Sequence, residues 1–259
     1  MRRRRIGALE LYVGAMFIVM FFPLVVLVLF SFVKSGDMRF PITGFTLSWY
    51  REVFSDSSVL DGILNSLEVG IFAGLIVTCI VTPAVLLLSR GRLRWAGGVA
   101  AVLIAPAALP GIVIGVSLLN LFGDLRMTLS LVTVTVGHVI YCIPFFYLIL
   151  NARLKNFDRH LEEAAMDLGA GPWQRFRRLV LPLTAPAILG ATMVVLALSW
   201  DEFQITFFTI GDRSTLPLVI WSRARRVIDP SVNAIGTLMI AGSLLIVLLT
   251  RRLIVESYS

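Results

Sequence analysis

Two adjacent acidic residues, Asp201 and Glu202, interrupt a stretch of otherwise apolar sequence that extends from about residue 183 to residue 208. A carboxylate inside a membrane is costly, and such residues usually face a water-filled path or a partner charge. If the span begins near Leu183, Asp201 lies about 27 Å along the helix and therefore near the outer interface. If the helix enters the lipid later, near Ile188, the acidic pair lies deeper and lines a pathway. The sequence leaves both positions open.

A histidine, His138, lies inside another apolar stretch. It is placed either to relay protons in a secondary transporter or to hydrogen-bond with a neighbouring helix. The chain has two histidines in total, too few for a histidine-rich metal site. Cys79 and Cys142 lie in apolar stretches, which is typical of small buried hydrophobic residues. We therefore predict no metal site and no disulfide.

The chain lacks a motif for binding nucleotide phosphates. No G-x-x-x-x-G-K-[S/T] sequence occurs, and no Gly-Lys pair exists in the chain. No nucleophile–base arrangement is present in the sequence either. We predict that the chain is not an enzyme by itself and binds no cofactor.

The composition predicts an all-α integral membrane protein. The chain has 259 residues, of which 58% are hydrophobic and 15% are charged. Crossing a hydrocarbon core of about 30 Å requires about 20 apolar residues. The long apolar stretches predict six transmembrane helices within a single domain of residues 1–259, at about 11–33, 66–89, 97–122, 128–151, 183–208 and 232–250.

The net charge of +7 is explained by arginines at the ends of the spans, so nucleic acid is not an expected partner. If the N-terminus is cytoplasmic, 15 of the 23 Lys and Arg residues fall on the cytoplasmic side. This bias predicts that both termini and the loop at 152–182 lie in the cytoplasm.

The loop at 152–182 contains a short amphipathic helix. Leu161, Ala164, Ala165 and Leu168 follow the i, i+3, i+4, i+7 spacing of one helical face. A run from Gly169 to Pro172 then ends the helix, because glycine accepts positive φ and proline cannot continue the hydrogen-bond ladder. By pattern alone, this element is either a docking element for another protein or a solvated loop whose charges fix the topology.

The spacing within this loop resembles that of a known motif. Glu163-Ala164-Ala165, three residues, Gly169, nine residues and then the run from Leu179 to Pro182 are similar to the EAA loop of ABC-importer permeases. Leu179 stands where that family's pattern has isoleucine. The stretches at 109–117, 198–203 and 215–218 are similar to the second permease subunit of spermidine/putrescine importers, although iron, thiamine and sugar-derivative importers carry related versions.

The resemblance implies a type I ABC importer permease fold in a bacterial inner membrane, in contact with the lipid bilayer. It also implies a homologous permease subunit, two ATPase subunits and a periplasmic or extracellular substrate-binding protein as partners. Because this chain has no phosphate-binding motif, ATP and Mg²⁺ are expected on the separate ATPase subunits. The transported substrate is expected to be a polyamine such as spermidine or putrescine, and Asp201 and Glu202 are expected on its path. The residues expected to couple the permease to the ATPase are Leu161, Glu163, Ala164, Ala165, Leu168 and Gly169.

Two alternatives remain at this point. One is an ABC importer permease for another small solute, such as an opine, iron, thiamine or a sugar derivative. The other is a secondary transporter, which has no need of a cytoplasmic docking motif, so the EAA-like spacing counts against it. Measuring which solute is taken up distinguishes the first alternative from a polyamine importer. Identifying the subunits that copurify with the chain distinguishes a secondary transporter from an ABC importer.

Overall fold

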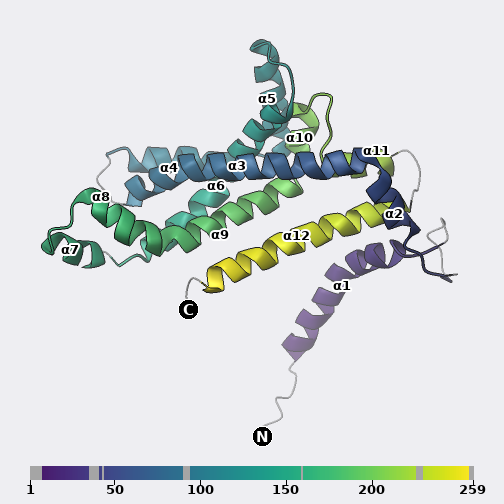
Figure 1. The fold of residues 1–259 in the computed structure, drawn as a ribbon, viewed down its shortest axis with the longest axis horizontal. Helices are drawn as coiled ribbons and strands as arrows, with labels where there is room; N and C mark the ends of the chain where they lie inside the picture. Colours follow the sequence, from purple (N-terminus) through teal and green to yellow (C-terminus); the bar gives the residue numbers. More distant parts are fainter. Residues whose placement is uncertain are drawn as a thin grey trace, which may run out of the picture. The chain divides into compact units, whose positions relative to one another are not determined.

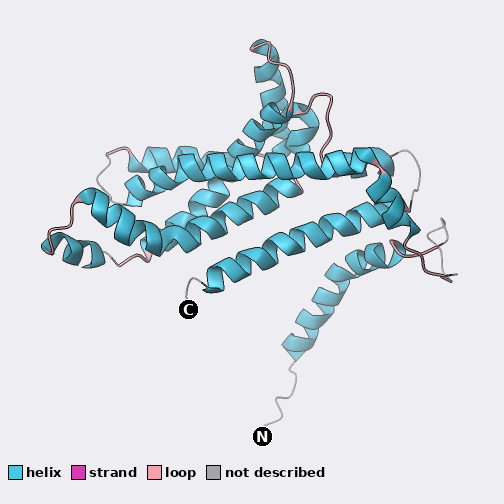
Figure 2. Ribbon diagram, viewed as in Figure 1, coloured by secondary structure: helices cyan, strands magenta, loops and turns pink. Residues whose placement is uncertain are grey.

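The computed structural model describes residues 8–34, 41–42, 44–89, 94–158, 160–225 and 230–256. Over these residues the chain is almost entirely helical (Figure 2), and the only extended pairing described is an isolated bridge between Val33 and Phe45. The helices are α1 (Ala8–Phe30), α2 (Ser48–Ser55), α3 (Ser57–Ser89), α4 (Ala96–Ile104), η1 (Ala105–Ala108), α5 (Gly111–Asp124), α6 (Leu131–Lys155), α7 (His160–Asp167), α8 (Pro172–Arg175), η2 (Phe176–Val180), α9 (Leu181–Trp200), α10 (Gln204–Thr209), α11 (Leu216–Ala224) and α12 (Ser231–Glu256).

Five helical segments of the described residues are long and apolar enough to cross a membrane, and a bent pair of helices makes up to six. This agrees with the expected all-α architecture. The arginines at positions 2–5, 90 and 92, on which the predicted orientation partly depends, lie outside the described residues. The five segments are Leu9–Phe30, Ser57–Ser89, Leu131–Lys155, Pro172–Trp200 and Ser231–Arg251.

The segment expected as one span at 97–122 differs from that expectation. Ala96–Ala108 and Gly111–Asp124 are separate helices that meet at an angle of 104°. The break falls at Leu109, which is extended, with φ −100° and ψ 133°. Proline disfavours the helical conformation of the residue before it and has no N–H to donate, so the first helix stops before Pro110, which is the N-cap of α5.

The stretch at 183–208 is also divided. The helix that includes α9 ends at Trp200, and the short helix α10 follows after three residues. At its other end this helix begins earlier than expected, because α8, the π-helix η2 and α9 are continuous from Pro172. The expected loop at 152–182 therefore contains the first turns of a long helix.

The described residues form two compact units, one from residues up to Leu60 with Ile220–Ala241, the other from Asp61–Val219 with the residues after Ala241. In the second unit, α3, α6 and α9 run alongside one another (Figure 1). Their shared core is apolar and includes Val77, Val81 and Val85 of α3, Cys142, Phe146 and Leu150 of α6, and Ile188, Ala191 and Val195 of α9.

Small residues let α3 and α9 approach closely. A side-chain carbon at Gly74 would lie 3.4 Å from a methyl carbon of Thr192, and one at Gly70 would lie 3.6 Å from Oγ of Ser199. One turn further along α3, the hydroxyls of Thr78 and Thr192 hydrogen-bond at 2.7 Å. Without a hydrophobic driving force between helices in lipid, this kind of close backbone contact stabilises their packing.

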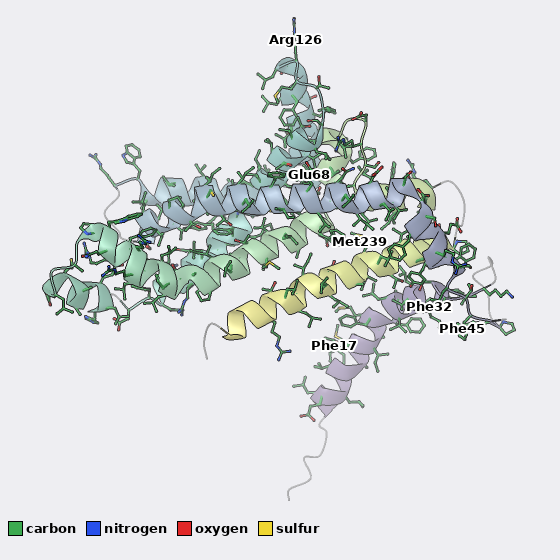
Figure 3. The ribbon with its side chains drawn as sticks, in the orientation of Figure 1. Phe17, Phe32, Phe45, Glu68, Arg126 and Met239 are labelled. Carbon is green, nitrogen blue, oxygen red and sulfur yellow. The ribbon has the colours of Figure 1, made fainter. Side chains whose placement is uncertain are left out.

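The first unit contains α1, α2, the C-terminal part of α11 and the N-terminal part of α12. The indole N–H of Trp49 donates to the carbonyl oxygen of Val33 at 2.8 Å, and the hydroxyls of Ser31 and Tyr50 hydrogen-bond at 2.7 Å. Arg223 forms an ion pair with Asp56. Most of α1 is exposed, and its side chains, including that of Phe17, project away from the helix (Figure 3).

Candidate functional site

The two predicted path residues follow directly from the end of α9. Asp201 is the C-cap of that helix and is exposed, whereas Glu202 is only 9% exposed. The carboxylate of Glu202 accepts hydrogen bonds from the backbone N–H groups of Ile205, at 3.0 and 3.1 Å, and Thr206, at 3.0 Å. These N–H groups lie in the first turn of α10 and have no partner within that helix, so Glu202 caps α10.

His138 connects three helices through its ring nitrogens. Its Nδ1 hydrogen-bonds with Oγ of Ser199 on α9 at 2.6 Å, and its Nε2 with Oγ1 of Thr206 on α10 at 2.8 Å. The same Nε2 lies 3.4 Å from Oε2 of Glu202. All four side chains are buried. Of the two roles considered for His138, the structure thus shows hydrogen bonding to neighbouring helices.

The N-terminus of α5 packs against α10. Oε1 of Gln204 accepts a hydrogen bond from the backbone N–H of Ile112 at 3.1 Å. A side-chain carbon at Gly115 would lie 3.2 Å from the carbonyl oxygen of Gln204 and from Cα of Ile205, so the contact depends on glycine. Gly111 also lies against Gln204. The spacing Gly111-x-x-x-Gly115 thus places two glycines where α5 packs against α10.

The far end of α5 lies away from these contacts. Arg126, which follows α5 with a positive φ of 54°, marks that end in Figure 3. The break at Leu109 is what turns α5 towards α10 instead of continuing α4. The bend thus brings residues 111–115 next to α10, which lies about 90 positions further along the chain.

Aromatic rings follow the acidic pair. The ring centroids of Phe203 and Phe207 are 5.7 Å apart, and those of Phe207 and Phe208 are 5.1 Å apart in an edge-to-face arrangement. Phe207 is 40% exposed. An exposed carboxylate and accessible aromatic rings on the same short segment are groups that attract organic cations.

The predicted amphipathic helix at the loop is α7. It begins where Oδ1 of Asp158 accepts the backbone N–H of His160, and Nδ1 of His160 lies 3.2 Å from Oε2 of Glu163. It ends at Asp167, two residues before Gly169, whose φ is +79°. The backbone N–H of Ala170 reaches back to the carbonyl of Ala165 at 2.9 Å, which is the glycine-dependent cap that the sequence predicts.

The apolar side of α7 is exposed in this structure. Leu161 is 45% exposed and Leu168 is 88% exposed, while Ala164 is exposed and Ala165 is half-buried. None of the residues of α7 is buried. The six predicted coupling residues therefore lie together on one solvent-accessible element, next to the start of the long helix Pro172–Trp200.

Sequence reasoning did not identify the cap and the bonds to His138, because it treated Asp201 and Glu202 as one pair. A signal was present. An acidic residue that precedes a short helix can accept hydrogen bonds from the N–H groups three and four positions later, and Glu202 stands in this relation to Ile205 and Thr206. The partner His138 lies too far away in the sequence for such a pattern to find.

Comparison with known proteins supports a transporter function. Residues 69–254 match a family model described as the binding-protein-dependent transport system inner membrane component. The chain is 32% identical over 232 residues to the putrescine transport system permease protein PotI of Escherichia coli K12, covering 86% of this chain and 82% of that protein. It is also 32% identical over 240 residues to the spermidine/putrescine transport system permease protein PotC of the same organism, covering 92% and 90%.

The fold is shared with solved ABC transporters. A bacterial ABC transporter involved in the import of the acidic polysaccharide alginate matches with a TM-score of 0.69 at 15% identity, over 96% of this chain and 94% of that one. The chain therefore belongs to the family of binding-protein-dependent transport system inner membrane components, which are the permeases of ABC importers.

Proposed function

We propose that this chain forms half of the translocation path of an ATP-driven importer for polyamines of the spermidine and putrescine type. The observation that carries the proposal is the 32% identity, over 92% of the chain, to a spermidine/putrescine permease. The chemistry of the acidic segment is compatible with it. A polyamine is a flexible polycation, and its ammonium groups are attracted by carboxylates and by the faces of aromatic rings.

In this proposal the two predicted path residues have different roles. The exposed carboxylate of Asp201 contacts the passing amine directly. Glu202 acts from within the protein, because its oxygens accept hydrogen bonds from α10 and it lies against His138. Glu202 thereby fixes the position of Asp201, Phe203 and Phe207 at the edge of the path.

We further propose that α7 couples this path to a separate ATPase subunit, which binds ATP and Mg²⁺. The exposed Leu161 and Leu168 supply apolar surface for burial, and the alanines between them allow a close approach. The side chain of Glu163 is 61% exposed and available to pair with a basic residue of the partner. The complete importer would contain a second, homologous permease, two ATPase subunits and a substrate-binding protein.

The location proposed for this assembly is the bacterial inner membrane. The bias of arginines predicts that α7 and both termini lie in the cytoplasm, which is where an ATPase has access to ATP. The substrate-binding protein would then deliver its cargo on the opposite side. This orientation is tested by adding a cysteine-reactive, membrane-impermeant reagent to cells that carry single cysteines near either terminus or in α7.

Uptake of labelled spermidine and putrescine tests the proposed substrate. Cells that lack the gene should lose uptake, and the wild-type gene should restore it, provided that no redundant system is present. A Glu163→Lys copy, present in the membrane at the same level, should not restore uptake. If amine uptake is unchanged on deletion, the polyamine assignment is discarded, whereas the family membership is unaffected.

A further inference from the structure

A cavity of about 280 Å³ lies between α3 and η2. Its lining is apolar and consists of Thr82, Pro83, Leu86 and Leu87 from α3 and Phe176 from η2. Pro83 and Leu87 are exposed, so the cavity opens at the surface of the protein. Pockets for whole drug-sized ligands are typically about 300–1,000 Å³, so this one is suited to part of a flexible chain.

One polar atom of the cavity lining, and one on the residue before Phe176, lack hydrogen-bond partners. Oγ1 of Thr82, a lining residue, is buried and makes no hydrogen bond with any residue that the structure describes. The same is true of Nε of Arg175, the neighbour of Phe176. Buried polar groups are nearly always hydrogen-bonded, so the hydroxyl of Thr82 indicates that a group with acceptor oxygens belongs at this cavity.

Three arginines gather at the start of the helix that contains η2, whereas the acidic residues near it, Glu162, Glu163 and Asp167, belong to α7, which contacts η2. Arg175, Arg177 and Arg178 flank Phe176, and the helix Pro172–Trp200 contains no acidic residue. Within the described part of the chain, none of these three arginines forms an ion pair with a carboxylate, and Arg177 and Arg178 are exposed. An anion is therefore the complementary ligand.

We propose that this cavity binds one anionic phospholipid, with part of an acyl chain between α3 and η2 and the phosphate on the arginines of η2. The site lies at the start of a candidate span, where the headgroup region of a bilayer meets the hydrocarbon. Arginine clusters at such positions recognise anionic headgroups. The hydroxyl of Thr82 can donate a hydrogen bond to an ester oxygen of the same lipid.

The position of the lipid has a consequence for the helix. Residues of η2 form a π-helix between α8 and α9, and such segments lack the regular i→i−4 ladder. A bound lipid would contact this irregular segment through Phe176 and the arginines, and would thus stabilise it. This inference concerns a lipid site and does not depend on the identity of the transported solute.

The test uses the assembled transporter in nanodiscs that contain a phosphatidylglycerol with a photoactivatable group in its acyl chain. Labelled peptides should include residues 82–87 and Phe176. Unlabelled phosphatidylglycerol should compete with the label and phosphatidylcholine should not. Leu86→Trp, which fills the cavity, should abolish labelling at this site, whereas Ile80→Trp, at an exposed position of α3 outside the cavity, should not change it.

The arginines are tested separately. The double variant Arg177→Gln/Arg178→Gln should lower the preference for phosphatidylglycerol over phosphatidylcholine by about tenfold or more, because each surface arginine contributes to attraction of an anionic headgroup. Labelling spread evenly over the exposed apolar faces, equal labelling of Leu86→Trp, or equal competition by phosphatidylcholine would each overturn the proposal. Crosslinks from these residues to a partner subunit in place of lipid would also overturn it.

Discussion

Nε2 of His138 on α6 lies 3.4 Å from Oε2 of Glu202, and both side chains are almost completely buried. The histidine also hydrogen-bonds to Ser199 and Thr206, and the glutamate caps α10. Each polar group therefore has partners on other helices, which is the condition under which a buried polar network is stable. The network fixes the end of α9 and the start of α10, and with them the turn that carries Asp201.

Replacing Glu202 with alanine should destabilise the protein. The change removes the acceptor for the N–H groups of Ile205 and Thr206 and leaves them buried, at a cost of about 1–3 kcal/mol for an unsatisfied buried group. Thermal unfolding of the purified permease in detergent should show a lower midpoint. Asp201→Ala, at the exposed neighbouring position, is the control and should change the midpoint little. Equal midpoints for Glu202→Ala and the wild type would contradict the capping role.

Asp201→Asn should impair amine transport without destabilising the fold. Loss of one solvated ion pair corresponds to about 1 kcal/mol, or roughly a fivefold higher KM for uptake. Initial rates of spermidine uptake over a range of concentrations measure this change. Asp212→Asn removes an exposed carboxylate from the loop after α10 and serves as the matched control. Unchanged kinetics in Asp201→Asn would place this carboxylate outside the transport path.

Gly169→Val should uncouple ATP hydrolysis from uptake. A β-branched residue is strained at a φ of +79°, by roughly 1–2 kcal/mol, so the cap of α7 should be lost. Asparagine tolerates this conformation, and Gly169→Asn should retain most activity. Gly171→Ala is a further control, because φ there is −69° and no atom crowds the added carbon.

The readout for these glycine variants is the ratio of solute uptake to ATP hydrolysis in the copurified complex. Wild-type coupling in Gly169→Val, at an equal amount of assembled complex, would refute the docking role of α7. Equal impairment of Gly169→Asn and Gly169→Val would show instead that any side chain at this position is excluded by a partner surface.

Gly115→Val should separate α5 from α10. The added atoms would meet the backbone of Gln204 and Ile205, which cannot move aside as a flexible side chain can, and overpacking of this kind costs about 1–3 kcal/mol. Limited proteolysis of the loops around α5 should become faster. Gly123→Ala, at the other end of α5 in open space, should leave the digestion rate unchanged. Unaltered digestion of Gly115→Val would show that the contact is loose.

The ion pair in the first unit should make stability depend on pH. The hydroxyl of Ser58, its backbone N–H and the guanidinium of Arg223 hold the pKa of Asp56 below its ordinary value of 3.8, against the opposing effect of burial. Near pH 4 the unfolded state therefore binds more protons than the folded state, and stability rises with pH. The contribution is present above the ordinary pKa and is lost as the pH falls through the folded value.

Unfolding midpoints measured from about pH 6 down to about pH 3 test this dependence. Asp56→Asn should flatten the part of the profile below about pH 4. Ser58→Ala should move the loss of stability to a higher pH. The reason is that it removes the hydroxyl of Ser58, which is the largest contribution to the lowered pKa of Asp56. Identical profiles for Asp56→Asn and the wild type would contradict the prediction.

The features that were predicted from the sequence are local ones. The apolar runs predict the long helices, and the spacing of Leu161, Ala164 and Leu168 before Gly169 predicts α7 and its cap, because both depend on residues within a few positions. The sequence also drew attention to Asp201 and Glu202. In each case the interaction that determines the structure is close in sequence.

The features that escaped prediction depend on distant contacts. His138 and Ser199 are separated by 61 positions, and Gln204 accepts a hydrogen bond from Ile112, which lies 92 positions earlier. The break at Leu109 was also missed, since proline within a membrane helix is compatible with either a kink or a complete break. Packing of α5 against α10 decides between these outcomes, and no pattern in residues 97–122 contains that information.

One helix, Pro172–Trp200, begins beside α7 and is followed directly by Asp201. With 29 residues it is about 40 Å long. If a helix of this length tilts by about 5° about one of its ends, the other end moves by about 3–4 Å. A single helix therefore connects α7, which is proposed to contact the ATPase, to Asp201, which is proposed to contact the transported amine. The π-helix η2, near the start of this helix, is the position at which the helix can bend.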